Sequence, residues 1–280
     1  MQPFRKLAFV VNAEKSGAPE LAQELSDIAR KAGVKKIKIS SDKDLSERYF
    51  KGCDACCVIG GDGTLLGAVR GAANENIPII GVNQGSLGFL TTFSAEEARA
   101  QFATLLLGDY RVAHRSLLEC KAGFGKRDVA LNDVLIKNET NSRLVRLEVQ
   151  ADGKLVTEYY CDGMIFSTPT GSTAYNLAAG GPIIHPSAGV IAMTPICPHT
   201  LSNRTIIFRD NVKLTVINRS SDSRLLVAMD GQRNTAVTGG ETIEIAISSR
   251  TLALAQRRDY SPFEVMRAKP KWSGGLVEKK

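Results

Sequence analysis

The sequence predicts two domains: an α/β N-terminal domain with a doubly wound parallel sheet, and a mainly antiparallel all-β C-terminal domain. In the first third, short apolar runs alternate with segments of helical periodicity, the pattern of parallel strands joined by helices. After Gly108, short runs rich in valine, isoleucine, leucine and threonine follow one another. The length of 280 residues suits about two domains. We place the boundary near residue 95.

The elements of the first domain follow from hydrophobic periodicity and stop signals. Leu7–Val11 is an unbroken apolar run, as in a strand buried on both faces. Pro19–Gly33 has one apolar helical face and ends at a glycine. Ser94 and Glu97 match a capping box that begins a helix ending near Gly108. Strands are predicted over 7–11, 34–39, 55–59 and 77–82, and helices over 19–33, 65–73 and 95–108.

The second domain is predicted to consist of a series of short strands. Asp152 and Gly153 between two of them indicate a hairpin turn. A short helix is predicted to begin near Thr173. Strands are predicted over 115–122, 129–137, 144–151, 155–160, 164–168, 212–218, 224–229 and 242–248.

Composition narrows the classes of protein to consider. The apolar runs are too short to cross a bilayer, and no signal-peptide pattern begins the chain, so we expect no membrane contact and a cytoplasmic location. The net charge of +7 is not accompanied by a nucleic-acid recognition motif, so no nucleic-acid partner is expected. The six cysteines have no zinc-ligand spacing and are expected to be reduced thiols.

The first chemical signal is the loop from Gly60 to Thr64, Gly-Gly-Asp-Gly-Thr, between a buried strand and a helix. Glycines allow main-chain N–H groups to approach phosphate oxygens, and a helix N-terminus favours anions. A carboxylate here repels phosphate unless it positions a metal ion or accepts a proton from a hydroxyl. Asp62 is therefore a candidate metal-positioning group or general base; the alternative is a helix N-cap in a glycine-rich turn.

Two further polar stretches interrupt the β-rich half. The segment 161–176 gathers hydroxyls around Pro169 and Gly171 and could bind ribose or phosphate; it could also be a serine/threonine-rich loop with a helix cap. Asn132 and Asp133 interrupt an apolar run; they could recognise an adenine edge and ribose hydroxyls, or form a strand-end bulge.

Together these motifs resemble the NAD kinase family. The matching segments, spread over most of the chain, are GGDGT at 60–64, GVNQGSLGFL at 81–90, LNDVLI at 131–136, DGMIFSTPTGSTAYNLAAGGPI at 162–183, PHTLSNR at 198–204 and DGQ at 230–232. GGDGT alone is shared with diacylglycerol and sphingosine kinases, whereas the long STPTGSTAY stretch is much more specific.

The resemblance implies an enzyme that transfers the γ-phosphoryl group of ATP to the adenosine ribose 2′-hydroxyl of NAD. It also implies a divalent metal, most often Mg²⁺, a homodimer or homotetramer, and a site in the interdomain cleft. The tail 258–280 is expected to return to the first domain, which gives domains of 1–95 and 96–257.

The resemblance assigns a role to individual residues, with Asp62 as the catalytic carboxylate. No side chain is assigned to a metal, and Tyr160 stands where relatives often carry a basic residue. The phosphate-binding residues would be Gly60, Gly61, Gly63 and Thr64. The NAD-binding residues would be Asp62, Gly63, Asn83, Phe89, Asn132, Asp133, Arg143, Tyr160, Asp162, Thr173, Ala174, Tyr175, Asn176, Leu177, Ala178 and Gln232.

Two other functions are considered beside NAD kinase. A lipid kinase of the diacylglycerol kinase type would share GGDGT, but the 162–183 segment and the lack of a membrane-binding amphipathic stretch favour NAD. A catalytically silent dinucleotide-binding regulator would retain the binding motifs, and the intact Asp62 argues against it.

Overall fold

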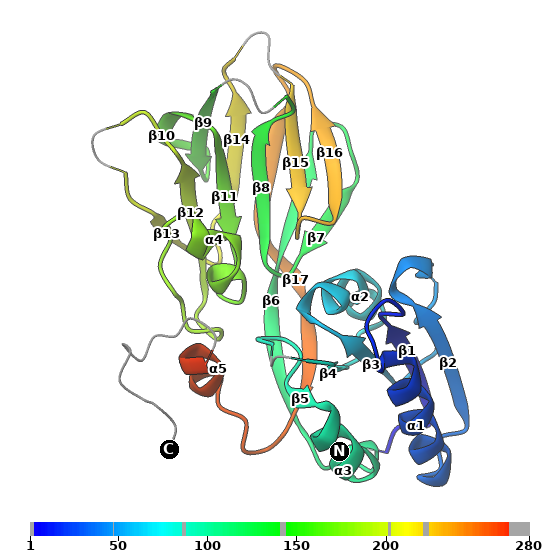
Figure 1. The fold of residues 1–280 in the computed structure, drawn as a ribbon. Helices are drawn as coiled ribbons and strands as arrows, with labels where there is room; N and C mark the ends of the chain where they lie inside the picture. The colour runs from blue at the N-terminus through cyan, green and yellow to red at the C-terminus, as the bar shows by residue number, and fades with distance from the viewer. Residues whose placement is uncertain are drawn as a thin grey trace. The chain divides into compact units, whose positions relative to one another are not determined.

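A computed structural model describes residues 3–46, 48–85, 88–140, 144–200, 203–220 and 224–268 (Figure 1). The chain divides into two compact units, residues 1–114 with 252–280, and residues 115–251. Two long strands, β6 (Arg111–Ala122) and β17 (Thr242–Gln256), contribute residues to both units. The predicted fold class, an α/β domain followed by a mainly antiparallel β domain, is confirmed.

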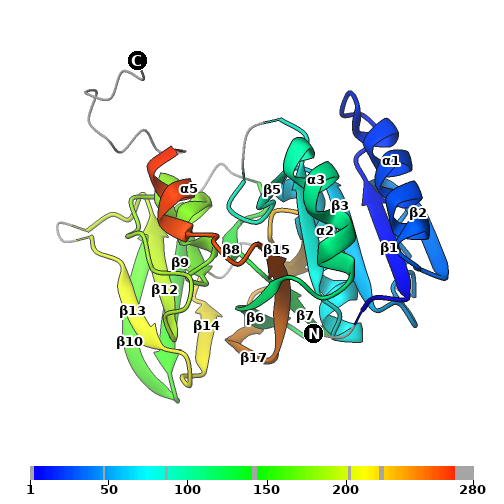
Figure 2. The same cartoon turned by 90° about the horizontal axis from the view of Figure 1, so that it is seen from below.

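Unit 1 has a parallel sheet with helices on both faces. Its strand order is β17-β4-β3-β1-β2, and each pairing is parallel. Figure 2 shows β2 at the edge beside β1. The elements are β1 (Lys6–Val11), α1 (Ala18–Lys31), β2 (Lys36–Ser41), the 3₁₀ helix η1 (Asp42–Asp44), β3 (Ala55–Gly60), α2 (Asp62–Glu75), β4 (Ile79–Asn83), β5 (Phe93–Ser94), α3 (Ala95–Leu106) and α5 (Pro262–Ala268).

Alternation along the buried strands explains the layers of unit 1. Leu7, Phe9 and Cys57 face a core shared with α1 and α3, which also pack on each other. The helix α2 covers the opposite face. A Cβ at Gly81 of β4 would stand 2.8 Å from the Leu90 carbonyl oxygen and 2.9 Å from the Thr91 Cα atom, so the close approach of the following loop requires glycine at this position.

Unit 2 contains two antiparallel sheets that share one apolar core. One has the order β10-β9-β14-β17 and the other β13-β12-β11-β8-β15-β16 (Figure 1). The core includes Val134, Ile136 and Phe166 of the second sheet with Leu147 and Val216 of the first. The elements are β7 (Arg127–Ala130), β8 (Asp133–Asn138), β9 (Val145–Ala151), β10 (Lys154–Cys161), β11 (Gly163–Ser167), η2 (Gly171–Thr173), α4 (Tyr175–Ala178), β12 (Val190–Ile196), β13 (Ile206–Arg209), β14 (Leu214–Asn218), β15 (Leu225–Met229) and β16 (Arg233–Val237).

The division between the units differs from the boundaries at 95 and 257. The helix α3 belongs to unit 1 because it packs on α1, and the chain passes into unit 2 only at Arg115. It returns at Leu252 because the end of β17 pairs with β4. The start of the tail is held in unit 1 by an Arg258–Asp109 ion pair of 2.6 Å. Residues 269–280 lie outside the described part of the chain.

Several element boundaries also differ from expectation. The run 129–137 is two strands, β7 and β8, separated by a turn. The helix predicted from residue 65 begins at Asp62. The capping box of Ser94 and Glu97 is present, and Asp152 and Gly153 form the predicted turn with φ of 49° and 76°. Among the described residues, no helix is long and apolar enough to span a membrane. All six cysteines are free thiols.

Candidate functional site

In unit 1 the Asp62 side chain is directed into the loop that follows β4. Asp62 is the first residue of α2, but its carboxylate does not cap that helix. It accepts hydrogen bonds from the main-chain N–H groups of Phe89, Leu90 and Thr91 at 2.9, 3.2 and 3.1 Å. The Thr91 hydroxyl donates a fourth at 3.1 Å. The N-cap alternative is therefore wrong, and the carboxylate is rigidly oriented.

The loop approaches Asp62 so closely that Gly88 has to be a glycine. A Cβ built on Gly88 would stand 2.0 Å from the Asp62 Oδ1 atom and 2.3 Å from the Thr91 hydroxyl oxygen. Any larger residue would displace the carboxylate or the hydroxyl. In the glycine loop itself, a Cβ at Gly60 would stand 2.6 Å from the Thr64 hydroxyl oxygen, whereas a Cβ at Gly63 would meet nothing within 4 Å.

A buried amide beside this network has an acceptor without a donor. Asn83 is the last residue of β4 and is 4 % exposed; its Nδ2 donates to the Thr91 hydroxyl at 2.8 Å. The Asn83 Oδ1 atom is buried and has no hydrogen-bond partner among the described residues. A buried acceptor without a partner is costly. A hydroxyl or amine of a bound molecule is the kind of group that would satisfy it.

The carboxyl ends of the parallel strands also gather polar groups that the sequence reading did not include. Asn12 follows β1, and its side-chain amide donates to the Thr64 hydroxyl at 3.3 Å. The Thr64 hydroxyl in turn donates to the carboxylate of Asp42, which follows β2, at 3.4 Å. The Lys15 ammonium lies 3.4 Å from the Gly60 carbonyl oxygen. In open α/β sheets this edge is where ligands bind. Lys15 therefore adds a positive charge beside the glycine loop.

In unit 2 a turn between β7 and β8 is held from both sides. The main-chain N–H groups of residues 131–133 donate to the Asp230 carboxylate at 2.9, 2.7 and 3.2 Å. On the carbonyl side, Asn132 accepts from the Thr168 N–H at 2.9 Å, and Leu131 accepts from the Thr168 hydroxyl at 2.5 Å. The three segments that looked like separate signals in the sequence, 131–133, 167–171 and 230–232, therefore meet in one place.

Asp133 is the unusual titratable group of this region. It is 6 % exposed, and its carboxylate accepts no hydrogen bond from the described residues. Burial, and then the negative charge of Asp230, raise the pKa of Asp133 to about 7. A buried carboxylate of this kind is a candidate ligand-binding group because hydroxyl donors of a substrate would stabilise its charged form.

Gly171 fixes the spacing between the two segments. A Cβ at Gly171 would stand 2.0 Å from the Asn132 carbonyl oxygen, which is main chain and cannot swing aside. We expect Gly171→Ala to lower the stability of the fold by about 1–3 kcal/mol, the usual effect of overpacking, and to weaken dinucleotide binding. Thermal unfolding measures the change in stability. Gly63→Ala is the control: its Cβ would meet nothing within 4 Å, so this variant should not have a lower Tm. An unchanged Tm for Gly171→Ala would contradict the expectation.

The remaining predicted residues divide into exposed groups and buried supports. Tyr175 is 46 % exposed and Tyr160 is 51 % exposed, with the Arg146 guanidinium 5.6 Å above the Tyr160 ring. Asp162 and Gln232 are also exposed. Arg143 lies outside the described residues. Phe89, Thr173, Ala174 and Leu177 are half-buried, and Ala178 and Gly63 are exposed.

Asn176 is placed to hold the loop rather than to bind a ligand with its side chain. It is fully buried, and its amide donates to the carbonyl oxygens of Ser172 and Pro182, both at 3.2 Å. Its Oδ1 accepts from the Thr194 hydroxyl at 2.7 Å. Each polar atom of the amide thus has a partner within unit 2. A contact with a ligand at this position would come from the main chain.

The described residues contain no group of three or more histidine, cysteine, aspartate or glutamate side chains that could hold a metal ion. Mg²⁺ in phosphoryl-transfer sites is commonly held by one or two carboxylates together with substrate phosphates. The residues near Asp62 are compatible with that arrangement, in which the nucleotide brings most of the ligands.

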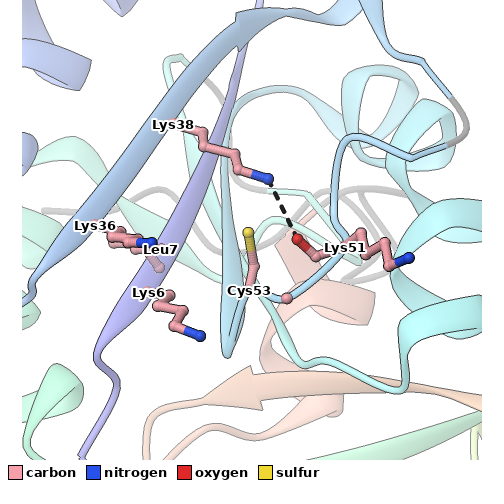
Figure 3. A pocket seen from close by; sticks show the side chains of 7 residues that line it. Lys6, Leu7, Lys36, Lys38, Lys51 and Cys53 are labelled. Carbon is pink, nitrogen blue, oxygen red and sulfur yellow. Dashed lines mark hydrogen bonds between the residues drawn. The ribbon is translucent and has the colours of Figure 1, made fainter.

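A pocket of about 260 Å³ lies at the other end of the unit 1 strands (Figure 3). Its lysines include Lys6 and Lys36, which begin β1 and β2 and are register partners, and Lys38, which donates to the Lys51 carbonyl oxygen at 3.3 Å. These are the amino ends of the strands, whereas the glycine loop follows a carboxyl end. Lysines on the edge strand β2 protect it from pairing with other chains. The pocket is lined by Lys6, Leu7, Lys36, Lys38, Lys51, Gly52 and Cys53.

Parallel strands that end in a glycine loop and an oriented carboxylate, with a buried polar turn on a second all-β unit, define a nucleotide-binding two-domain protein. The model of the ATP-NAD kinase N-terminal domain matches residues 6–110, and that of the ATP-NAD kinase C-terminal domain matches residues 131–256. The chain belongs to the ATP-NAD kinase family.

Individual relatives agree with this assignment. The NAD kinase of Geotalea daltonii is 41% identical over 223 residues, covering 78% of each chain. The NAD kinase of Pseudomonas fluorescens is 41% identical over 247 residues, covering 86% of this chain and 81% of the relative.

Two solved structures share the fold. Yeast NADH kinase complexed with NADH has a TM-score of 0.83 at 23% identity, covering 100% of this chain and 91% of that one. An NAD kinase from Archaeoglobus fulgidus in complex with ATP has a TM-score of 0.77 at 23% identity, covering 93% of this chain and 96% of that one.

Proposed function

We propose that this protein is an NAD kinase that transfers the γ-phosphoryl group of ATP to the adenosine ribose 2′-hydroxyl of NAD, giving NADP. The observation that carries the proposal is the assignment of both halves of the chain to the two domains of the ATP-NAD kinase family. The oriented carboxylate of Asp62 and the polar turn at 131–133 are the groups that such a reaction needs.

Asp62 is proposed to act as the general base. A ribose hydroxyl is a weak nucleophile near neutral pH, and a carboxylate within hydrogen-bond reach can orient it and accept its proton as the phosphoryl group arrives. The donors from residues 89–91 support this role because they hold the carboxylate in one orientation. Preorganised positioning of this kind is a main source of rate enhancement in phosphoryl transfer.

The turn of unit 2 is proposed to recognise the adenosine end of NAD. The Asn132 main chain is fully engaged, whereas its side-chain amide makes no hydrogen bond with the described residues. Asn can pair with an adenine edge through both amide groups, and a carboxylate can accept from ribose hydroxyls. Asn132 and Asp133 would therefore act as a pair on one nucleoside.

The phosphates are proposed to lie against Gly60, Gly61, Gly63 and Thr64. The N-terminus of α2 favours negative charge, and the nearby Lys15 ammonium adds to it. We propose that Mg²⁺ enters with ATP and, when bound, neutralises phosphate charge during transfer.

The test of the proposed function is product formation. The purified protein incubated with NAD, ATP and Mg²⁺ should produce NADP, detected by an NADP-specific dehydrogenase coupled to a dye. NAD binding without product would favour a silent regulator. Phosphorylation of a diacylglycerol or sphingosine acceptor in place of NAD would favour a lipid kinase.

Two further expectations from the family resemblance stay proposals. We propose that the chain forms a homodimer or homotetramer and acts in the cytoplasm. The burial of five of its six free thiols is compatible with a reducing compartment. Light scattering coupled to gel filtration measures the assembly: a mass near two or four times 30.2 kDa is expected, and a monomer contradicts it.

A further inference from the structure

The chain turns sharply after β15, at a residue to which the sequence reading gave no role. Asp230 has a φ of 51° and is followed by Gly231 with a φ of 65°. The left-handed region is uncommon for residues other than glycine, and aspartate tolerates it better than most. The Asp230 N–H donates to the Asp133 carbonyl oxygen at 3.0 Å, so this turn is fastened to the start of β8.

The Asp230 side chain completes the attachment. Its Oδ2 accepts from the Leu131 N–H at 2.9 Å, and its Oδ1 accepts from the N–H groups of Asn132 and Asp133 at 2.7 and 3.2 Å. Three successive amides directed at one anion resemble the main-chain nests that bind phosphate, with a carboxylate in the place of the anion. Residues 131 and 132 lie between strands, so their N–H groups have no ladder partner and depend on this side chain.

The arrangement places a second negative charge beside Asp133. Asp230 is 9 % exposed, and burial raises its pKa while the three N–H donors oppose that shift. The titratable and charged groups that act on Asp230 also include Arg233, whose guanidinium contacts Asp128 at 2.7 Å and the Val129 carbonyl oxygen at 2.6 Å. A change at Asp230 should therefore alter both the geometry of the turn and the protonation of Asp133.

We infer that Asp230 is a positioning residue for the dinucleotide, which sets the direction of the Asn132 and Asp133 side chains by holding their main chain. Asp230 itself does not touch the substrate. The inference rests on the proposed function, because it assumes that Asn132 and Asp133 bind NAD. If Asp230 had a purely structural role, its replacement would lower the stability of the protein without raising KM for NAD selectively over KM for ATP.

The test compares Asp230→Asn with Asp152→Asn. The asparagine keeps one acceptor oxygen but turns an NH₂ group toward an N–H donor. Asp152 is a matched control because it also has a positive φ of 49° in a turn and accepts a main-chain N–H, from Lys213 at 3.0 Å. We expect Asp230→Asn to raise KM for NAD about tenfold or more, with KM for ATP within twofold, and Asp152→Asn to change neither.

Two further readouts separate positioning from simple loss of structure. With Asp230 neutral, the pH midpoint of NAD binding, measured by calorimetry, should move to lower pH because a like charge beside Asp133 is removed. Asp230→Glu, which keeps the charge, should leave that midpoint near the wild-type value. An unchanged KM for NAD in folded Asp230→Asn would overturn the inference, as would loss of folding in both variants. Wild-type protein that makes no NADP would instead overturn the proposed function.

Discussion

Replacing Asp62 with asparagine should reduce kcat by about 10²–10⁴-fold, the usual contribution of a general base. KM for NAD should change by only a few-fold, because the asparagine keeps an oxygen that can accept from the 2′-hydroxyl and because Asn132 and Asp133 are unchanged. The substitution also removes an acceptor from the network of residues 89–91. A loss of about 1–3 kcal/mol in the free energy of unfolding should therefore accompany it. Steady-state kinetics and denaturant unfolding on the same preparation measure both effects.

Thr91→Val separates the catalytic from the structural role of this carboxylate. It deletes the hydrogen bond from the Thr91 hydroxyl to Asp62 and leaves the Asn83 amide without its acceptor, while the carboxylate stays in place. Its loss of stability should be similar to that of Asp62→Asn, but its kcat should fall about tenfold at most. Equal losses of kcat in the two variants would mean that Asp62 acts only by holding the loop.

Replacing Asp133 with asparagine should have opposite effects on binding and on stability. The variant loses a charged acceptor, so KM for NAD should rise about 10–100-fold. The pKa of Asp133 in the folded protein, about 7, lies above its ordinary value of 3.8. Its contribution to stability is therefore full below about pH 4 and is lost as the pH rises through 7. Above pH 7 the variant should have the higher Tm.

The direction in which KM for NAD changes with pH tests the proposed role of Asp133. Wild-type KM for NAD should fall as the pH rises through about 7, because the ionised Asp133 accepts hydrogen bonds from ribose hydroxyls more strongly than the protonated acid does. Asp133→Asn should remove that dependence. The control is Glu139→Gln, because Glu139 is exposed and follows the far end of β8; this variant should keep the wild-type profile. A wild-type KM for NAD that does not vary between pH 6 and 8 would contradict the role given to this carboxylate.

The fold was predictable where local patterns are strong. A few neighbouring residues are enough to determine the local structure in three places: the unbroken apolar run 7–11, the capping box at Ser94 and the Asp152–Gly153 turn. Three strands of unit 2 escaped prediction for physical reasons, as did the two-residue strand β5 of unit 1. In β12 Pro195 interrupts the apolar run, β13 is only four residues long, and β16 is largely polar. The parallel pairing of β17 with β4 joins distant parts of the chain and leaves no local signal.

The candidate site was predictable in its motifs but not in its contacts. The glycine loop and the Asn132–Asp133 pair stand out because polar residues interrupt apolar strands. Thr91 and Asp230 gain their importance from partners far along the chain, so spacing alone could not identify them. Asn176 illustrates the opposite case, because it lies in a segment predicted to bind NAD, yet its amide is used within the fold.

A crystal structure of the protein with NAD tests the central claim most directly. We expect an Asp62 carboxylate oxygen within hydrogen-bond distance, about 2.6–3.2 Å, of the adenosine ribose 2′-oxygen. Asn132 and Asp133 should contact the same nucleoside. A bound dinucleotide whose 2′-oxygen lies far from Asp62, with a different group beside it, would contradict the account.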